Sequence, residues 1–303
     1  MDLIRNLALY KIKGMSRFYT DPQKYREQKV RDFLFDKLSL KIKNKKGDTS
    51  PNSNSKIPVW IFWSQGFDNA PLFIRKNLNH TKQILSSNYV IHALDLSQLL
   101  SLIDIPDYIL NKYYAGKIKQ AFFSDLVRFY LLDKFGGLWL DSTVYITQSE
   151  IPVDIKNVPH FIFQDINFNV DSENERLTHI PGSNWLIYSQ KGDYWTTLVR
   201  ELLTSYWKNF NTFSYYYTTH LIMGLVFDAN PDWYKKMPKY NNDLPHLVQH
   251  IMSAPYNEES IVNALSSSFA HKLSYKQIYY SEIDKQLFMN KLFGISKGDE
   301  EVL

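Results

Sequence analysis

The chain has 303 residues, of which 44% are hydrophobic and 16% aromatic, so it can bury the core of one large domain and is not a disordered chain. It contains no cysteine, which excludes disulfides and thiolate metal sites and fits a reducing compartment. The formal net charge is +4, but residues 1–46 hold thirteen Lys or Arg residues against five acidic ones, whereas the remaining chain is acidic overall.

Residues 1–45 form a basic arm in which apolar residues have helical spacing in places, as at Phe33, Leu34 and Leu38. Such an arm can pack on the domain as a solvated helical face, lie on an anionic membrane, where each base contributes about 1 kcal/mol, or contact nucleic acid. We favour the packed face, with membrane contact second. We expect no nucleic acid, because the rest of the chain is acidic and shows no nucleic-acid module.

Residues 46–56 are rich in Ser, Asn, Gly and Pro, so we expect a flexible linker there. We expect no membrane span, because apolar runs such as 221–227 are far shorter than the roughly 20 residues needed. We expect no signal peptide either, because the opening MDLIRNLALYK is interrupted by charge. The expected location is cytoplasmic, with peripheral contact at the inner face of the plasma membrane as the alternative.

After the linker, strand-like and helix-like segments alternate. Strands are predicted at residues 59–63, 89–94, 138–140, 161–164 and 184–189, and helices at 70–86, 95–102, 106–114, 121–133 and 194–209. This alternation predicts an α/β fold with a mainly parallel sheet. We expect residues 170–178 to form a polar loop. The aromatic segment 215–227 contains His220, and a lone histidine there is more often a core residue than a ligand.

The segment 121–147, AFFSDLVRFYLLDKFGGLWLDSTVYIT, concentrates polar residues in an otherwise apolar stretch. Asp125 and Arg128 are three residues apart on the predicted helix and therefore share one face. Gly136 and Gly137 are expected to end that helix, one in a left-handed conformation and the other at a close backbone approach. Asp141 then follows a short buried strand, at the end where open α/β sheets bind ligands.

A purely structural interpretation of these residues remains open. Asp125 and Arg128 can form a structural ion pair, and Asp141 can cap a turn by accepting the backbone N–H of Thr143. Three polar groups that converge within a short stretch of dense core nevertheless indicate a site.

The segment resembles the core motif of the capsular polysaccharide synthesis glycosyltransferases, S-D-x-x-R followed by L-x-x-x-G-G-x-W/Y-x-D-x-T/D. That group is related to the family 32 (DXD-type) sugar transferases and more distantly to the glucosylating clostridial toxins. The matching residues are Ser124, Asp125, Arg128, Leu132, Gly136, Gly137, Trp139, Asp141 and Thr143. The resemblance extends to residues 57–71, 105–118 and 271–273. It implies a GT-A-like (Rossmann-like) glycosyltransferase domain over residues 57–290, followed by a tail at 291–303.

The resemblance also implies roles for individual residues. Asp125, Arg128 and Asp141 would be the catalytic residues: Asp125 holds the ribose or the sugar, Arg128 bonds the donor or orients Asp125, and Asp141 binds a divalent cation, Mn²⁺ or Mg²⁺. Such a cation would neutralise the leaving diphosphate. The residues implied at the nucleotide are Trp63, Ser64, Gln65, Gly66, Asp125, Gly137 and Lys272.

Thr143 departs from the many relatives that carry a second Asp there, and a hydroxyl is a poorer metal ligand than a carboxylate. The resemblance suggests His271 as the further ligand beside Asp141 and Thr143, and Lys272 as a phosphate contact. The alternative for His271 is an exposed loop histidine with no ligand.

The resemblance implies a UDP-sugar-dependent hexosyltransferase that moves galactose or glucose onto a lipid-linked oligosaccharide during surface polysaccharide synthesis. Related enzymes mostly retain the anomeric configuration, with the leaving phosphate accepting the acceptor's proton, so no separate base is expected. The resemblance also implies that the segment 215–227 lines the acceptor side, which makes His220 a candidate there. Asp228 and Asp243 are further polar groups that can lie near the acceptor. The alternatives are a two-carboxylate glycoside hydrolase and a non-catalytic sugar-nucleotide or carbohydrate-binding protein.

Overall fold

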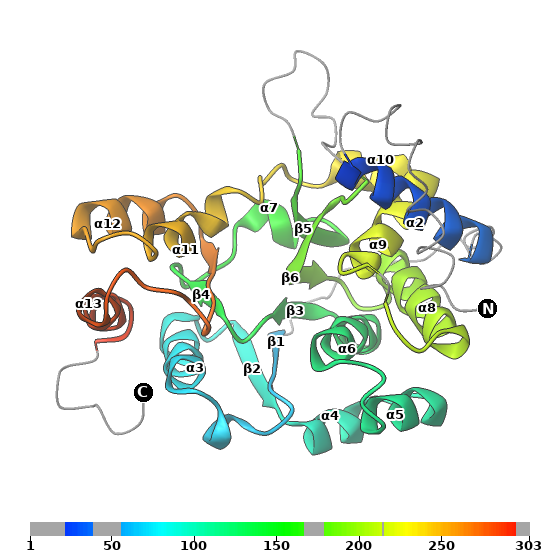
Figure 1. Ribbon diagram of the computed structural model, residues 1–303, viewed down its shortest axis with the longest axis horizontal. Coiled ribbons are helices and arrows are strands. Elements are labelled where there is room, and N and C mark those ends of the chain that lie inside the picture. Colours follow the sequence, from blue (N-terminus) through cyan, green and yellow to red (C-terminus); the bar gives the residue numbers. More distant parts are fainter. Residues whose placement is uncertain (1–21, 39–55, 167–178, 214, 295–303) are drawn as a thin grey trace, which may run out of the picture.

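The computed structural model describes residues 22–38, 56–166, 179–213 and 215–294 (Figure 1). At its centre is a five-stranded sheet with the strand order β2-β1-β3-β6-β5. These strands are β1 (Ile57–Phe62), β2 (Tyr89–Leu94), β3 (Gly137–Leu140), β5 (His160–Gln164) and β6 (Gly182–Ser189). The pairs β1–β2 and β1–β3 are parallel, and β6 is antiparallel to both of its neighbours. Four strands therefore point the same way, which confirms the predicted α/β fold with a mainly parallel sheet.

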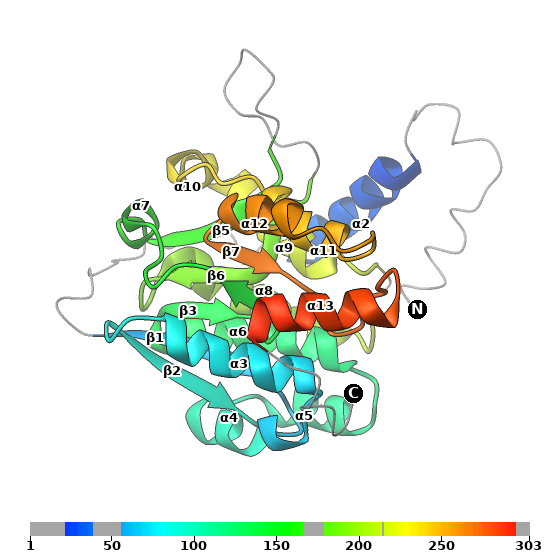
Figure 2. The same cartoon turned by 90° about the vertical axis from the view of Figure 1, so that its left-hand side faces the viewer.

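Helices cover both faces of the sheet, and the side chains of β1 show how the two layers arise (Figures 1 and 2). Trp60 and Phe62 point into one buried core, whereas Val59 and Ile61 point into the other, because successive side chains of a strand alternate between faces. The first core is closed by α2 (Pro22–Leu38), α4 (Leu96–Leu102), α5 (Asp107–Tyr114), α6 (Gln120–Phe135), α8 (Tyr194–Asn209), α9 (Thr218–Ala229) and α10 (Pro231–Lys236).

The second face carries α3 (Leu72–Ile84), α7 (Val153–Lys156) and a small antiparallel sheet of β4 (Val144–Ile146) and β7 (Ala270–Lys272). Outside this layer lies a third apolar cluster, shared by α3 and the C-terminal helices. Those helices are α11 (Leu247–Ile251), α12 (Glu258–Ser266) and α13 (Glu282–Phe293). The described chain also contains two short 3-10 helices, η3 (Phe67–Asn69) and η4 (Leu244–His246). The small sheet matters for function because β7 brings the C-terminal part of the chain beside the segment that follows β3.

The described part of the basic arm, helix α2, packs on the domain (Figure 1). Val30 and Leu34 are buried in the first core. Arg31 Nη2 lies 2.8 Å from Asp228 Oδ2, and the Tyr215 hydroxyl donates to Glu27 Oε1 at 2.9 Å. These contacts agree with the packed interpretation of this part of the arm.

Most predicted elements appear within a few residues of their expected ends, and local chemistry explains the differences. Helix α3 begins at Leu72 because Pro71 occupies its N-cap position, and Asp95 precedes α4 as a cap whose carboxylate accepts from Gln98 N. The linker, apart from residue 56, and the expected polar loop at 170–178 lie outside the described residues. Across the described ranges, no helix combines the length and apolar character needed to cross a membrane.

The two glycines after α6 have different tasks. Gly136 is the C-cap of α6 with a φ of 69°, a conformation that favours glycine. Gly137 begins β3 with a φ of 101°, and a Cβ built on it would lie 2.2 Å from the carbonyl oxygen of Pro58 in β1. The glycine pair therefore lets the chain leave the helix and enter the sheet tightly against β1, as the sequence predicted.

Candidate active site

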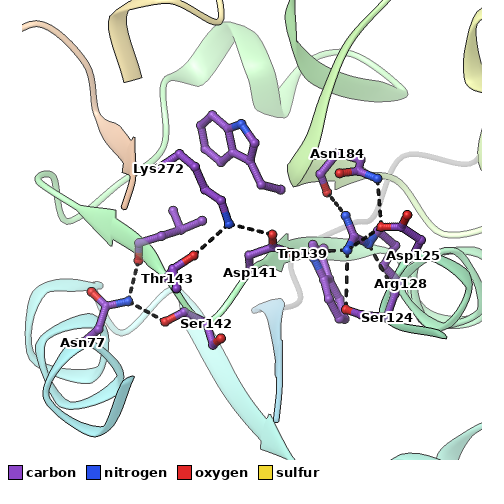
Figure 3. A network of polar contacts seen from close by, with 12 residues as sticks. Asn77, Ser124, Asp125, Arg128, Trp139, Asp141, Ser142, Thr143, Asn184 and Lys272 are labelled. Atoms are coloured by element: carbon purple, nitrogen blue, oxygen red, sulfur yellow. Dashed lines mark hydrogen bonds and ion pairs between the residues drawn. The ribbon is translucent and has the colours of Figure 1, made fainter. Parts of the chain in front are cut away.

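A cavity of about 510 Å³ lies where the parallel strands β1 and β3 end. β1 leads into the turn at Trp63, Ser64 and Gln65, and β3 leads into Asp141. Helix α6 and the small sheet add the remaining polar groups (Figure 3). The lining thus includes most of the residues that the sequence analysis singled out, namely Trp63, Ser64, Gln65, Asp125, Arg128, Asp141, Thr143 and Lys272.

Asp125 projects from α6 into a ring of donors. Its Oδ1 lies 2.9 Å from Arg128 Nη2 and accepts from Asn184 Nδ2 at 3.0 Å, and its Oδ2 accepts from Thr219 Oγ1 at 3.0 Å. Burial nevertheless raises the pKa of Asp125, against the opposing effect of these three partners. Each carboxylate oxygen has about two acceptor directions, so Oδ2 keeps one for a ligand hydroxyl.

Arg128 is 3% exposed and joins the groups around it into one unit. Its guanidinium donates to the Ser124 carbonyl oxygen from Nε at 3.2 Å and to the Asn184 carbonyl oxygen from Nη1. Nη2 lies 3.4 Å from Asp141 Oδ1, and the guanidinium carbon lies 5.1 Å from the centre of the Trp139 ring. A rigid five-donor group is suited to holding several acceptors at fixed angles.

Asp141 is held at the end of β3 by three donors. Its Oδ1 accepts from Trp139 Nε1 at 2.9 Å and lies near Arg128, and its Oδ2 lies 2.8 Å from Lys272 Nζ. Burial by itself would raise the pKa of Asp141, but Lys272 and Arg128 together hold that pKa below its ordinary value. Asp141 is therefore a carboxylate at neutral pH.

Lys272 reaches the site because β7 pairs with β4, which places it opposite Val144. Its Nζ donates to Asp141 Oδ2 at 2.8 Å and to Thr143 Oγ1 at 2.7 Å (Figure 3). The segment after Asp141 is fixed from the other side by Asn77, whose Nδ2 donates to the carbonyl oxygens of Ser142 and Val144, both at 2.9 Å.

His271 does not lie where the metal-ligand prediction requires. It precedes Lys272 in β7, so its side chain points to the opposite face of the small sheet. Its Nε2 lies 3.0 Å from the carbonyl oxygens of both Leu265 and Ser268, the ring is fully buried, and it is not part of the cavity lining. The predictions of a metal ligand and of an exposed loop histidine are both wrong for this arrangement.

Two glycines predicted at the nucleotide are also absent from the lining. Gly137 lies at the start of β3, whereas the cavity lies at its other end, and the residue serves the approach to Pro58 instead. Gly66 closes the turn beside the cavity by donating its N–H to the Trp63 carbonyl oxygen at 2.9 Å.

The residues at the expected cation position do not fit a divalent metal ion. Hard divalent cations select several oxygen ligands, mainly carboxylates. Here the oxygens are one carboxylate, from Asp141, and one hydroxyl, from Thr143, and the ammonium group of Lys272 is bonded to both. Within the described ranges, no group of three or more His, Cys, Asp or Glu side chains is placed to hold a metal.

Two residues that hold Asp125 were not among the predicted site residues. Asn184 and Thr219 come from β6 and α9, and only the fold brings them to α6. His220 lines the cavity, and burial together with Arg128 lowers its pKa to about 3. Its Nδ1 is buried and has no hydrogen-bond partner among the described residues. By contrast, Asp228 is paired with Arg31, and neither Asp228 nor Asp243 lines this cavity.

Comparisons with known proteins give matches to one family model and to several glycosyltransferases. The sequence model of the family described as "Capsular polysaccharide synthesis protein" matches residues 14–292. The chain is 30% identical over 99 residues to the glycosyltransferase afumC of Aspergillus fumigatus, a match covering 30% of this chain and 25% of that protein. It is 27% identical over 96 residues to the O-glycosyltransferase braB of Annulohypoxylon truncatum, a match covering 29% of this chain and 23% of that protein.

The matches to these curated relatives thus span about a quarter of their length. Among solved structures, the PaToxG glycosyltransferase aligns with 12% identity and a TM-score of 0.36, over 90% of this chain and 96% of that one.

Proposed function

Because the chain belongs to the capsular polysaccharide synthesis protein family, we propose that it is a glycosyltransferase that moves a hexose, glucose or galactose, from a UDP-sugar to a lipid-linked oligosaccharide. One observation carries this proposal. A roomy cavity at the carboxyl ends of the parallel strands holds two aspartates together with the cationic groups of Arg128 and Lys272. Ligands of open α/β sheets bind at this edge, and paired cations suit a diphosphate.

The aromatic lining supports a nucleotide and a sugar as occupants. Trp63, Tyr216 and Tyr275 line the cavity, and the rings of Trp63 and Tyr275 meet edge to face with centroids 5.5 Å apart. Aromatic faces pack against planar bases and against the apolar faces of sugar rings, and the hydroxyl of tyrosine adds a polar contact. We assign the Trp63–Gln65 turn to the uridine end of the donor.

The polar residues of the cavity have separate roles in the transfer. In the transfer, the bond between the anomeric carbon and the diphosphate oxygen breaks, and a bond to the acceptor oxygen forms. The leaving nucleoside diphosphate takes the electron pair and, with retention, the acceptor's proton. Asp125 Oδ2 accepts from a hydroxyl of the ribose or sugar, and Arg128 holds Asp125 and Asp141 in place. Fixed donors aimed at the developing negative charge lower the barrier.

An acceptor carried on a lipid would place the reaction at the cytoplasmic face of the plasma membrane. The concentration of basic residues in 1–46 supports peripheral contact there, since anionic lipids attract such segments. Co-sedimentation with vesicles of anionic lipid, compared with neutral vesicles, tests this contact. Binding that does not differ between the two would argue against it.

The glycoside hydrolase alternative is less favoured because both carboxylates bond to Arg128, an arrangement that suits anion binding better than an acid paired with a nucleophile. A screen of UDP-sugars by thermal shift and by donor hydrolysis tests the proposal. We expect stabilisation by UDP and slow release of UDP from one hexose donor. Hydrolysis of a simple glycoside without nucleotide would support the hydrolase, and binding without turnover would support a non-catalytic protein.

A matched pair of variants on α6 sharpens this test. Asp125→Asn should abolish turnover, because an amide cannot replace a carboxylate facing Arg128, Asn184 and Thr219. Asp133→Asn is the control, since Asp133 is also a partly buried aspartate of α6 paired with an arginine, Arg200, but lies outside the cavity. Equal losses in the two variants would contradict a specific role for Asp125.

A further inference from the structure

We propose that Lys272 takes the place of the divalent cation in this site, so that the donor diphosphate binds to the side chain of Lys272 and neither binding nor transfer requires a metal ion. The inference rests on the proposed function and deepens it. It concerns the group that neutralises the leaving diphosphate.

The position of the Lys272 side chain is fixed by its contacts and by the pairing of its strand. Its Nζ lies 2.8 Å from Asp141 Oδ2 and 2.7 Å from Thr143 Oγ1, the two side chains expected to face a cation. The strand pairing of β7 with β4 sets this position, and the Lys272 side chain is only 24% exposed. One positive charge therefore already occupies the place beside the carboxylate.

The chemistry of the neighbours fits a lysine better than a metal. A divalent ion bound here would have only one carboxylate ligand, from Asp141. It would also be repelled by the positive charge of the Lys272 ammonium group, so the site would bind the ion weakly. Thr143 is suited to an ammonium, because its hydroxyl oxygen can accept a hydrogen bond from Nζ. Thr143 and Lys272 therefore suit each other as neighbours, whereas neither side chain adds a carboxylate for a metal ion.

Lys272 also retains a donor for the ligand. An ammonium group has three N–H donors, and two are directed at Asp141 and Thr143. The remaining one is available to a diphosphate oxygen, and Lys272 lines the cavity together with Lys276 and Arg128. When the glycosidic bond breaks, the electron pair passes to the diphosphate oxygen, and the positive charge of Lys272 stabilises it through a charge-assisted hydrogen bond.

The test measures the affinity for UDP by calorimetry, in a chelator and in Mn²⁺, for the full chain and for Lys272→Met, which keeps the apolar stem without the charge. We expect the wild-type affinity to differ by less than about threefold between the two conditions, and Lys272→Met to weaken binding in chelator by about tenfold or more. Lys291→Met is the control, since Lys291 on α13 is also paired with an acidic residue, Glu258 of α12, but lies outside the cavity.

A second variant separates a direct role of Lys272 from a loss of folding. Lys272→Met combined with Thr143→Asp replaces the ammonium by a second carboxylate, so we expect UDP binding to return in Mn²⁺ and to be lost in chelator. UDP binding by the wild type that needs Mn²⁺, or an unchanged affinity in Lys272→Met, would overturn the inference and leave the proposed function standing. Failure of the wild type to bind UDP in either condition would overturn both.

Discussion

Arg128 Nη2 lies 2.9 Å from Asp125 Oδ1, and the Arg128 side chain is only 4% exposed. A buried charge stays in place only if its partners are close and well oriented, and here two carboxylates and two carbonyl oxygens surround the guanidinium. This unit ties α6, β3 and β6 together at the edge of the cavity. Stability and donor binding should therefore depend on the same side chain.

Replacing Arg128 by lysine should be costly although the charge is kept. Lysine has three donors on a flexible stem and cannot reproduce the fork that reaches Asp125, Ser124 and Asn184. We expect Arg128→Lys to lower the free energy of unfolding by about 2–4 kcal/mol in urea denaturation. Arg200→Lys, at a partly exposed pair with Asp133, should cost less than about 1 kcal/mol. Similar losses in the two variants would contradict this account of Arg128.

Gly137 and Gly66 both have a positive φ, of 101° and 81°, but they should respond differently to alanine. Gly137→Ala adds backbone strain and a clash with Pro58, because its Cβ would lie 2.2 Å from the Pro58 carbonyl oxygen. Gly66→Ala adds strain alone, since nothing lies within 4 Å of its Cβ position. We expect losses in free energy of unfolding of more than about 3 kcal/mol for Gly137→Ala and about 1–2 kcal/mol for Gly66→Ala. Chemical denaturation measures both, and an equal cost would show that the contact with Pro58 relaxes easily.

His220 should make the protein less stable in mild acid. In the unfolded chain a histidine has a pKa of about 6.5, whereas in the folded protein burial lowers the pKa of His220 to about 3. Between these values the unfolded state binds a proton that the folded state does not. The free energy of unfolding therefore falls as the pH falls, by at most about 1.4 kcal/mol per pH unit.

The variant His220→Asn has no side chain at this position that binds a proton when the protein unfolds. Its stability should fall less steeply than that of the wild type when urea denaturation is repeated between about pH 7 and pH 4. His80, His92, His246 and His271 also have lowered pKa values, but they contribute equally to both proteins and cancel in the comparison. Parallel pH profiles would mean that His220 is not buried as a neutral ring.

The sequence predicted those parts of the site that lie close together in the chain. Asp125, Arg128 and Asp141 share one helix and the strand that follows it, so helical spacing and the glycine pair were sufficient to bring them together. The alternation of strands and helices likewise predicted the mainly parallel sheet, because each segment has a clear hydrophobic period.

Prediction failed where long-range pairing decides which face a side chain occupies. His271 and Lys272 are neighbours in β7, and a shift of one residue in the pairing with β4 would exchange them. No local pattern gives that register, so His271 was predicted beside Asp141, where the structure places Lys272. Asn184 and Thr219 were missed for a related reason, since they meet Asp125 across 59 and 94 residues of chain.

A crystal structure of the chain with UDP tests the central claim most directly. The account predicts density for the nucleotide in the cavity at the ends of β1 and β3, with a diphosphate oxygen at hydrogen-bond distance from Lys272 Nζ and the uracil beside Trp63. Nucleotide bound elsewhere on the molecule, with Lys272 and Arg128 still turned only toward the two aspartates, would contradict it.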